Sequence, residues 1–141
     1  DNDAGTLSLG MYVGNGSSSG HCVTGSTFGT PSTATWYFCE AWHNPTSDLL
    51  GLCVNRGSDT TAAWSGGTTD TSNAFAIGAS SAGALFLDAI VDEVGFWKDR
   101  VLNSGERDQL YNSGAGLAYP FGGSSTAIRE LIGGGIISTV R

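Results

Sequence analysis

The residues of this chain best suited to acid–base chemistry are three carboxylates in one apolar stretch, Asp88, Asp92 and Glu93. A glycoside hydrolase needs two carboxylates that face each other across a cleft. In an extended strand Asp88 and Asp92 share one face, whereas Glu93 points to the other face. The acids are therefore not spaced for that reaction. We expect Asp92 and Glu93 to anchor the loop and helix that follow, through backbone N–H groups or through Arg100 or Arg107, and we expect no enzymatic activity.

A second group of residues fits the recognition of a sugar. Trp64 lies among small and polar residues, and an exposed aromatic ring beside amides or acids can stack on a sugar while its polar neighbours bond the hydroxyls. Such polar groups would come from Asp59, Asp70 and Asn73 in the neighbouring segments. A tryptophan in a strand is, however, more often a core or interface residue. We predict a glycan-binding site around Trp64, with burial of the ring as the alternative.

The histidines and cysteines form no zinc or nucleophile motif. His21 and His43 are too few and too far apart for a zinc site, and no Cys-x-x-Cys pair occurs. Cys39 and Cys53 flank a turn sequence, so a hairpin would place them roughly opposite one another. They would form a disulfide in an oxidising compartment, or remain two small buried thiols on one face. Together with Cys22 the count is odd, so the three cannot all pair within one chain.

The elements that would position these residues are short strands joined by polar turns. Glycine occurs 22 times and charged residues make up only 13% of the 141 residues, which suits a single all-β domain. Apolar alternation predicts strands at 7–13, 36–42, 49–55, 60–64, 75–78 and 85–97, with a further short one at 21–23. Three tryptophans are assigned to the core: Trp36, Trp42 and Trp97.

One segment, Ser104–Asn112, carries the signals of a helix. Asn103 and Glu106 have the spacing of a capping box, and Gly114 is placed to end the helix in a left-handed turn. The helix is expected to dock on the edge of a sandwich through two residues, Leu110 and Tyr111.

The order of these elements resembles the laminin-G-like jelly rolls of the concanavalin-A-like lectin and glucanase superfamily. The resemblance rests on Trp36–Trp42 with His43-Asn44-Pro45, on Val54-Asn55, on Phe75–Gly78 and on the block Asp88–Gly116. It covers residues 7–121 and implies an antiparallel β-sandwich (jelly roll) with one short C-terminal helix. The domain would span 1–121, and 122–141 would be an apolar docking or assembly tail. The glucanases of the superfamily carry Glu-x-Asp-x-x-Glu on one strand, a spacing that this chain does not meet.

We expect no cofactor, and the alternative that the resemblance implies is calcium. Relatives often bind Ca²⁺ through acids and loop carbonyls, the hard oxygen ligands that this ion requires. Asp48, Asp59 and Asp70 lie in loops that could meet at one end of a sandwich, together with Asn73. No contiguous Asp-x-Asp-x-Asp-Gly loop occurs, and acids that cap turns would explain these residues equally well.

Both ends of the sequence suggest assembly. Only six residues precede Leu7, where the family usually has further strands. The sandwich could be minimal, the chain could be truncated, or another subunit could complete an open sheet edge. The segment 127–140 is apolar enough that we expect it to pack on its own sandwich or on a neighbour. Its expected assembly residues are Leu131, Ile132, Ile136 and Ile137.

The charge and hydropathy of the chain limit the classes of partner that it can bind. The net charge of −7, from 13 acids and 6 bases, argues against nucleic acid as a partner, because no basic stripe is present to neutralise phosphates. The sequence contains no apolar run of about 18 residues, so we expect no segment that spans a membrane. The many Ser, Thr and Gly residues favour an extracellular or virion surface. We predict a non-catalytic surface module that binds glycans or partner proteins within a larger assembly. The alternative is a purely structural subunit, such as a phage-type capsid, decoration or fibre protein, that forms a homo-oligomer or lattice through its tail and open edge.

Overall fold

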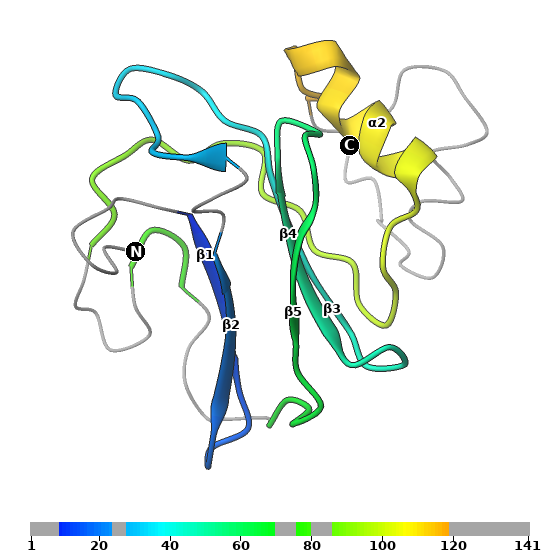
Figure 1. Cartoon of the computed structure of the whole chain (residues 1–141). Coiled ribbons are helices and arrows are strands. Elements are labelled where there is room, and N and C mark those ends of the chain that lie inside the picture. Colours follow the sequence, from blue (N-terminus) through cyan, green and yellow to red (C-terminus); the bar gives the residue numbers. More distant parts are fainter. Residues whose placement is uncertain (1–8, 24–27, 70–75, 80–85, 119–141) are drawn as a thin grey trace, which may run out of the picture.

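In the described part of the chain, the elements are two small antiparallel sheets, one short α-helix and a 3-10 turn (Figure 1). The computed structural model describes residues 9–23, 28–69, 76–79 and 86–118. The first sheet pairs β1 (Gly10–Gly14) with β2 (Ser19–Val23), and the second has the order β3 (Cys39–Asn44), β4 (Leu49–Val54), β5 (Thr60–Ala63). The predicted β-rich class with one helix is confirmed. Among the described residues no helix is long and apolar enough to cross a membrane.

The hairpin of β3 and β4 forms where the sequence predicts it. The side-chain oxygen of Asn44 accepts hydrogen bonds from the backbone N–H groups of Thr46 (3.0 Å) and Ser47 (3.3 Å), and this local bonding closes the turn. Trp42 lies opposite Gly51 in the register. A Cβ atom at Gly51 would overlap the indole ring of Trp42, so only glycine fits beneath this ring.

The core lies on the face of β4 that carries Leu50 and Leu52. Both side chains are buried and cluster with Trp64. Partly buried residues packed against this cluster are Leu9, Met11, Val13 and Ala62. Because Met11 and Val13 belong to β1, the two sheets share one hydrophobic core.

Trp64 is a core residue and not the exposed ring that glycan stacking would need. Only 9% of its surface is exposed. A Cβ atom at Gly20 or Gly66 would collide with the ring, so both glycines allow the chain to approach it closely. The ring Nε1 donates a hydrogen bond to the carbonyl of Gly67 (2.8 Å). Trp64 therefore fastens β2 to the segment that follows β5, which is the alternative that the sequence left open.

The strand predicted at 85–97 is absent from its described part, because no residue of 86–97 belongs to a sheet. Glu93 adopts a left-handed conformation (φ 51°), and its N–H group donates to the side chain of Asp92 (2.9 Å). This local bond competes with strand geometry. The described residues 76–79 likewise form bends in place of the strand predicted at 75–78.

The assignment of Trp36 to the core is wrong, because 66% of its surface is exposed.

The helix α2 (Ser104–Tyr111) matches its prediction to within one residue. Asn103 and Glu106 form both hydrogen bonds of the capping box, as their spacing predicts. The left-handed turn that ends the helix begins at Asn112, earlier than predicted, and a 3-10 turn η2 (Asn112–Gly114) follows. The helix begins and ends on signals that lie within its own sequence.

Candidate functional site

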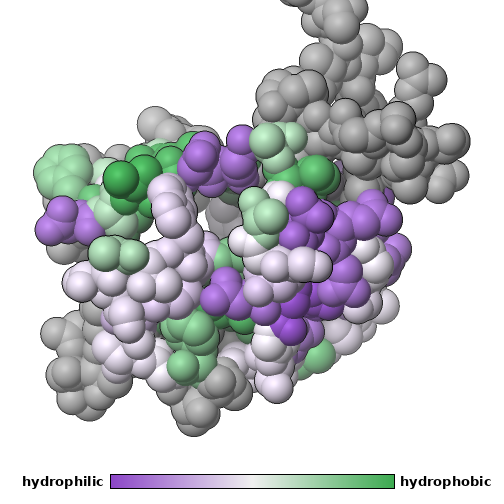
Figure 2. Space-filling view, turned by 90° about the horizontal axis from the view of Figure 1, so that it is seen from above, coloured by the Kyte–Doolittle hydropathy of each residue, from purple (hydrophilic) through white to green (hydrophobic). Residues whose placement is uncertain are grey.

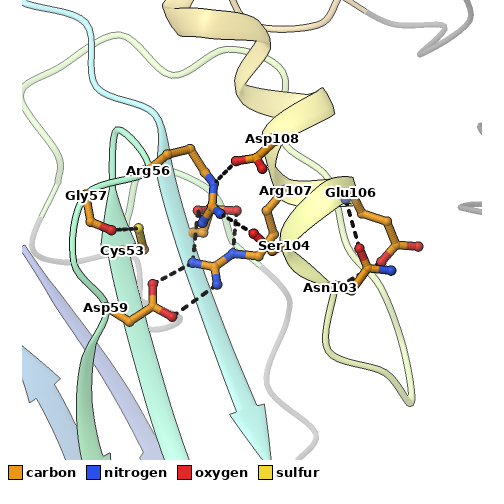
Figure 3. Close-up of polar contacts among 10 residues, drawn as sticks. Cys53, Arg56, Gly57, Asp59, Asn103, Ser104, Glu106, Arg107 and Asp108 are labelled. Carbon is orange, nitrogen blue, oxygen red and sulfur yellow. Dashed lines mark hydrogen bonds and ion pairs between the residues drawn. The ribbon is translucent and has the colours of Figure 1, made fainter.

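The most elaborate polar site of the described chain is the attachment of α2 to the second sheet. Arg107, which is buried, reaches from α2 to two carboxylates (Figure 3). It donates to both oxygens of Glu40 (2.9 and 3.2 Å) and to both oxygens of Asp59 (2.8 and 3.1 Å). A planar guanidinium is suited to such paired bonds, which are stronger than neutral hydrogen bonds.

The sheet supplies an aromatic surface for the same guanidinium. Glu40 and Trp42 are two residues apart on β3 and therefore share one face. The guanidinium carbon of Arg107 lies 4.5 Å from the centre of a Trp42 ring, within range of a cation–π interaction. Since Trp42 covers Gly51, three residues from three elements stack in order: Gly51, Trp42 and Arg107.

A second arginine extends the network. Arg56, in the turn after β4, bonds Asp108 (2.8 Å), Ser104 (3.1 Å) and Glu40 (3.4 Å) (Figure 3). We call Glu40, Arg56, Asp59, Arg107 and Asp108 the α2 clamp. Two arginines thus face three carboxylates, and each charge has an opposite partner. The α2 clamp uses its charges internally, so its chemistry is that of a structural anchor.

The clamp makes stability depend on pH. Hydrogen bonding to Arg107 holds the pKa of Asp59 below its ordinary value. A carboxyl whose folded pKa is depressed stabilises the protein at pH values above its unfolded pKa, and this contribution is lost as the pH falls through the folded pKa. We therefore expect acid to destabilise the wild type more than Asp59→Asn, which cannot titrate. Urea unfolding of both proteins between neutral pH and about pH 3 measures this difference, and equal acid sensitivity would contradict it.

The two described residues that were predicted to bind calcium, Asp48 and Asp59, do not meet. Asp48 precedes β4 and Asp59 precedes β5, and these strands run antiparallel with Leu49 opposite Ala63. The two carboxylates therefore lie at opposite ends of the β4–β5 ladder, and Asp59 is bound to Arg107. Asp70 and Asn73 lie outside the described residues. In the part of the chain that the structure describes, no three metal-ligating side chains gather.

A surface depression forms where three loops meet at the Asp48 end of that ladder. Its lining residues are Ser18, Asp48, Ala63, Trp64, Ser65 and Gly66. The side-chain amide of Asn15 donates to the carbonyl of Gly66 (2.9 Å), and the hydroxyl of Thr69 donates to the carbonyl of Asn15 (2.6 Å). These two bonds hold the β1–β2 loop against the segment that follows β5. The depression offers a carboxylate and two hydroxyls, beside a tryptophan that is largely buried.

Cys39 and Cys53 are not bridged. The register places Cys39 opposite Val54 and Cys53 opposite Glu40, so the two thiols point to different faces of the sheet. Cys39 is exposed and Cys53 is buried. A one-residue offset in the register thus excludes both sequence-based interpretations, the disulfide and the pair of buried thiols on one face.

The two thiols should differ in reactivity. Desolvation raises the pKa of both thiols, to about 11 for Cys53, whose Sγ lies 3.3 Å from the carbonyl of Gly57. The expected difference therefore comes from access, because Cys39 is exposed and Cys53 is buried. A protonated and buried thiol is a poor nucleophile. We expect a thiol reagent at neutral pH to modify Cys39 in the folded protein and Cys53 only after unfolding. Peptide mapping by mass spectrometry reads out both sites, and equal rates of modification would contradict this expectation.

The segment 86–97 places many apolar side chains at the surface. Between 45% and 79% of each is exposed: Phe86, Leu87, Ile90, Val91, Val94 and Phe96. The space-filling view shows hydrophobic residues at the surface beside hydrophilic ones (Figure 2). Carboxylates from Asp88, Asp92 and Glu93 interrupt this apolar run. We call residues 86–97 the apolar segment.

The anchoring expected of the acids in the apolar segment is only partly observed. Asp92 does accept a backbone N–H group, that of Glu93. Arg100, however, pairs with Glu106, and Arg107 pairs with Glu40 and Asp59. The role of Glu40 was missed, although a charged residue between aromatic residues on a strand was a usable signal for a buried ion pair.

Comparisons with protein-family models, with curated proteins and with solved structures find no match for this chain. Its function is therefore inferred from its own residues and geometry.

Proposed function

We propose that this chain is a non-catalytic surface module of a larger extracellular or virion assembly and that it binds a partner protein through the apolar segment. The observation that carries the proposal is the exposure of six large apolar side chains within eleven consecutive residues, 86–96. Soluble monomers rarely expose large contiguous apolar patches, and those that exist often mark interaction sites. The energetic gain from covering such side chains favours association.

The mode of binding that suits this segment is strand addition. The segment is rich in β-branched and aromatic residues, which favour a strand once a neighbouring strand is available. In that extended conformation its successive side chains would point to opposite faces. We propose that the two sheets belong to a jelly-roll sandwich of the laminin-G-like type and that the apolar segment completes its strand order when the partner binds. The assembly residues Leu131, Ile132, Ile136 and Ile137 lie outside the described residues and remain proposed contributors.

Glycan binding is the second candidate, because an exposed aromatic pair lies on the first sheet. Tyr12 is 57% exposed and stacks on His21, with ring centres 5.5 Å apart and planes inclined by 22°. The two residues lie opposite one another on β1 and β2. Exposed aromatic rings with polar tips can stack on sugars. This pair is a better platform than Trp64.

Replacing Ile90 and Phe96 together by serine tests the proposed role of the apolar segment. Because both side chains are exposed, we expect Ile90→Ser with Phe96→Ser to change the free energy of unfolding by no more than about 1 kcal/mol in total. Where the full chain self-associates in sedimentation experiments, the same variant should lose that self-association. Tyr12→Ser is the matched control, since it removes an exposed aromatic ring elsewhere and should leave association intact.

A loss of several kcal/mol in the serine variant would overturn the proposal, because these side chains would then pack inside the isolated chain. Sugar binding on a glycan array that Tyr12→Ser abolishes, without any association through the apolar segment, would favour the glycan candidate instead.

A further inference from the structure

We infer that the partner of the apolar segment is a second copy of this chain, bound as an antiparallel strand pair centred on Gly95 of both copies. The inference rests on the proposed function and specifies the partner and the register. Its argument is the order of charged and apolar residues along 88–98 and their exposure.

The charges of the segment are ordered so that a reversed copy complements them. Asp88 and Asp92 lie on its N-terminal side, and Lys98 lies on its C-terminal side. The side chain of Lys98 is 91% exposed and has only a loose contact of 3.9 Å with its neighbour Asp99. In an antiparallel pair centred on Gly95, Asp92 lies opposite Lys98 of the second copy. The two-fold symmetry repeats this pair, and opposite charges directly across from one another stabilise a sheet.

The same register also places one apolar residue opposite another next to its centre. Even-numbered residues share one face of an extended strand. On that face Val94 lies opposite Phe96 of the second copy, and both side chains are exposed in the single chain. Aromatic and β-branched residues form favourable cross-strand pairs. Each Val–Phe pair between the copies is thus flanked by an Asp–Lys pair, and Gly95 lies opposite its own counterpart.

Neighbouring registers are poorer. Centring the pair on Glu93 places this carboxylate opposite its own copy, and like charges directly opposite one another destabilise a sheet. Centring it on Val94 places Lys98 opposite Ile90, which separates the lysine from an acidic partner. The register centred on Gly95 keeps the two copies of Glu93 apart and gives Lys98 an acidic partner, while it places Ile90 opposite Arg100 and Glu93 opposite Trp97.

Pairing would also remove the kink at Glu93. A left-handed conformation is uncommon for a residue other than glycine (φ 51° here) and carries a steric cost. When the segment becomes extended, Glu93 leaves this conformation. Its N–H group then no longer donates to the side chain of Asp92 and can bond within the strand pair. The carboxylate of Asp92 then becomes available to the lysine of the second copy.

A charge-reversal experiment on the full chain tests the register. Sedimentation equilibrium would compare Asp92→Lys, Lys98→Asp, the double variant and an equimolar mixture of the two single variants. Each single variant brings like charges together twice, so we expect its self-association to weaken about tenfold or more. In the mixture and in the double variant opposite charges face each other again, and association should recover to near the wild-type level. Asp88→Lys is the matched control, because it makes the same charge change outside the Asp92–Lys98 pair.

The outcomes separate the two proposals. Association of all variants equal to wild type, or a failure of both the mixture and the double variant to recover, would overturn the register. A wild-type chain that stays monomeric at every concentration would overturn the second copy as partner. In that case the proposed function would still be judged by the stability of Ile90→Ser with Phe96→Ser.

Discussion

Arg107→Ala is expected to lower the free energy of unfolding by about 3–5 kcal/mol. The substitution leaves the largely buried carboxylate of Glu40 without its paired hydrogen bonds and removes the cation from Trp42. It also releases Asp59, whose two oxygens bind the same guanidinium. Breaking one partner of a buried ion pair costs far more than losing an exposed one, because the remaining charge stays desolvated. Urea unfolding followed by tryptophan fluorescence measures the change.

Arg100→Ala is the matched control for Arg107→Ala. Arg100 pairs with Glu106 in a pair that is more exposed than that of Arg107 with Glu40, and losing a pair near the surface costs about 1 kcal/mol or less. A large difference between the two variants is expected if the α2 clamp anchors the helix. Similar small losses would show that α2 does not depend on the clamp, and the structural role assigned to Arg107 would then be wrong.

Trp64→Ala is expected to cost about 3–5 kcal/mol of stability, as is usual when a large aromatic residue is removed from a core. The ring belongs to the cluster of Leu50 and Leu52 and fits closely against Gly20 and Gly66. Its removal would leave a cavity between the two sheets and free the carbonyl of Gly67. Thermal or urea unfolding of the full chain reads out the loss.

Trp36→Ala provides the comparison within the same chain. Trp36 is 66% exposed, and substitutions at exposed positions usually change stability by about 0.5 kcal/mol or less. If Trp64→Ala were as stable as Trp36→Ala but lost binding to a sugar, Trp64 would be a ligand residue. That result would contradict the core assignment made from its burial.

Local signals in the sequence predicted local structure well. The capping box of Asn103 and Glu106 located the start of α2, and Asn44 located the hairpin turn, because all the atoms involved lie within a few residues. Residues that depend on distant neighbours were predicted poorly. Arg107 and Glu40 are 67 positions apart, and nothing near either residue identifies the other.

Three errors have specific physical causes. Small residues around Trp64 in the sequence suggested exposure, yet one of them, Gly66, permits close packing on the ring, as does Gly20 from β2. The pairing of Cys39 with Cys53 failed because their register differs by one residue, which reverses the faces. The strand predicted at 85–97 has the composition of a strand, but a strand also needs a neighbour, which its own sequence cannot supply.

Hydrogen–deuterium exchange of the backbone amides of 88–98, measured at low and at high protein concentration, tests the central claim most directly. If the apolar segment is a docking surface for a second copy, these amides exchange fast in dilute solution and become protected as the concentration rises. The amides of β4 should stay protected throughout and serve as the internal reference. Exchange of 88–98 that does not change with concentration would contradict the claim that this segment binds a second copy.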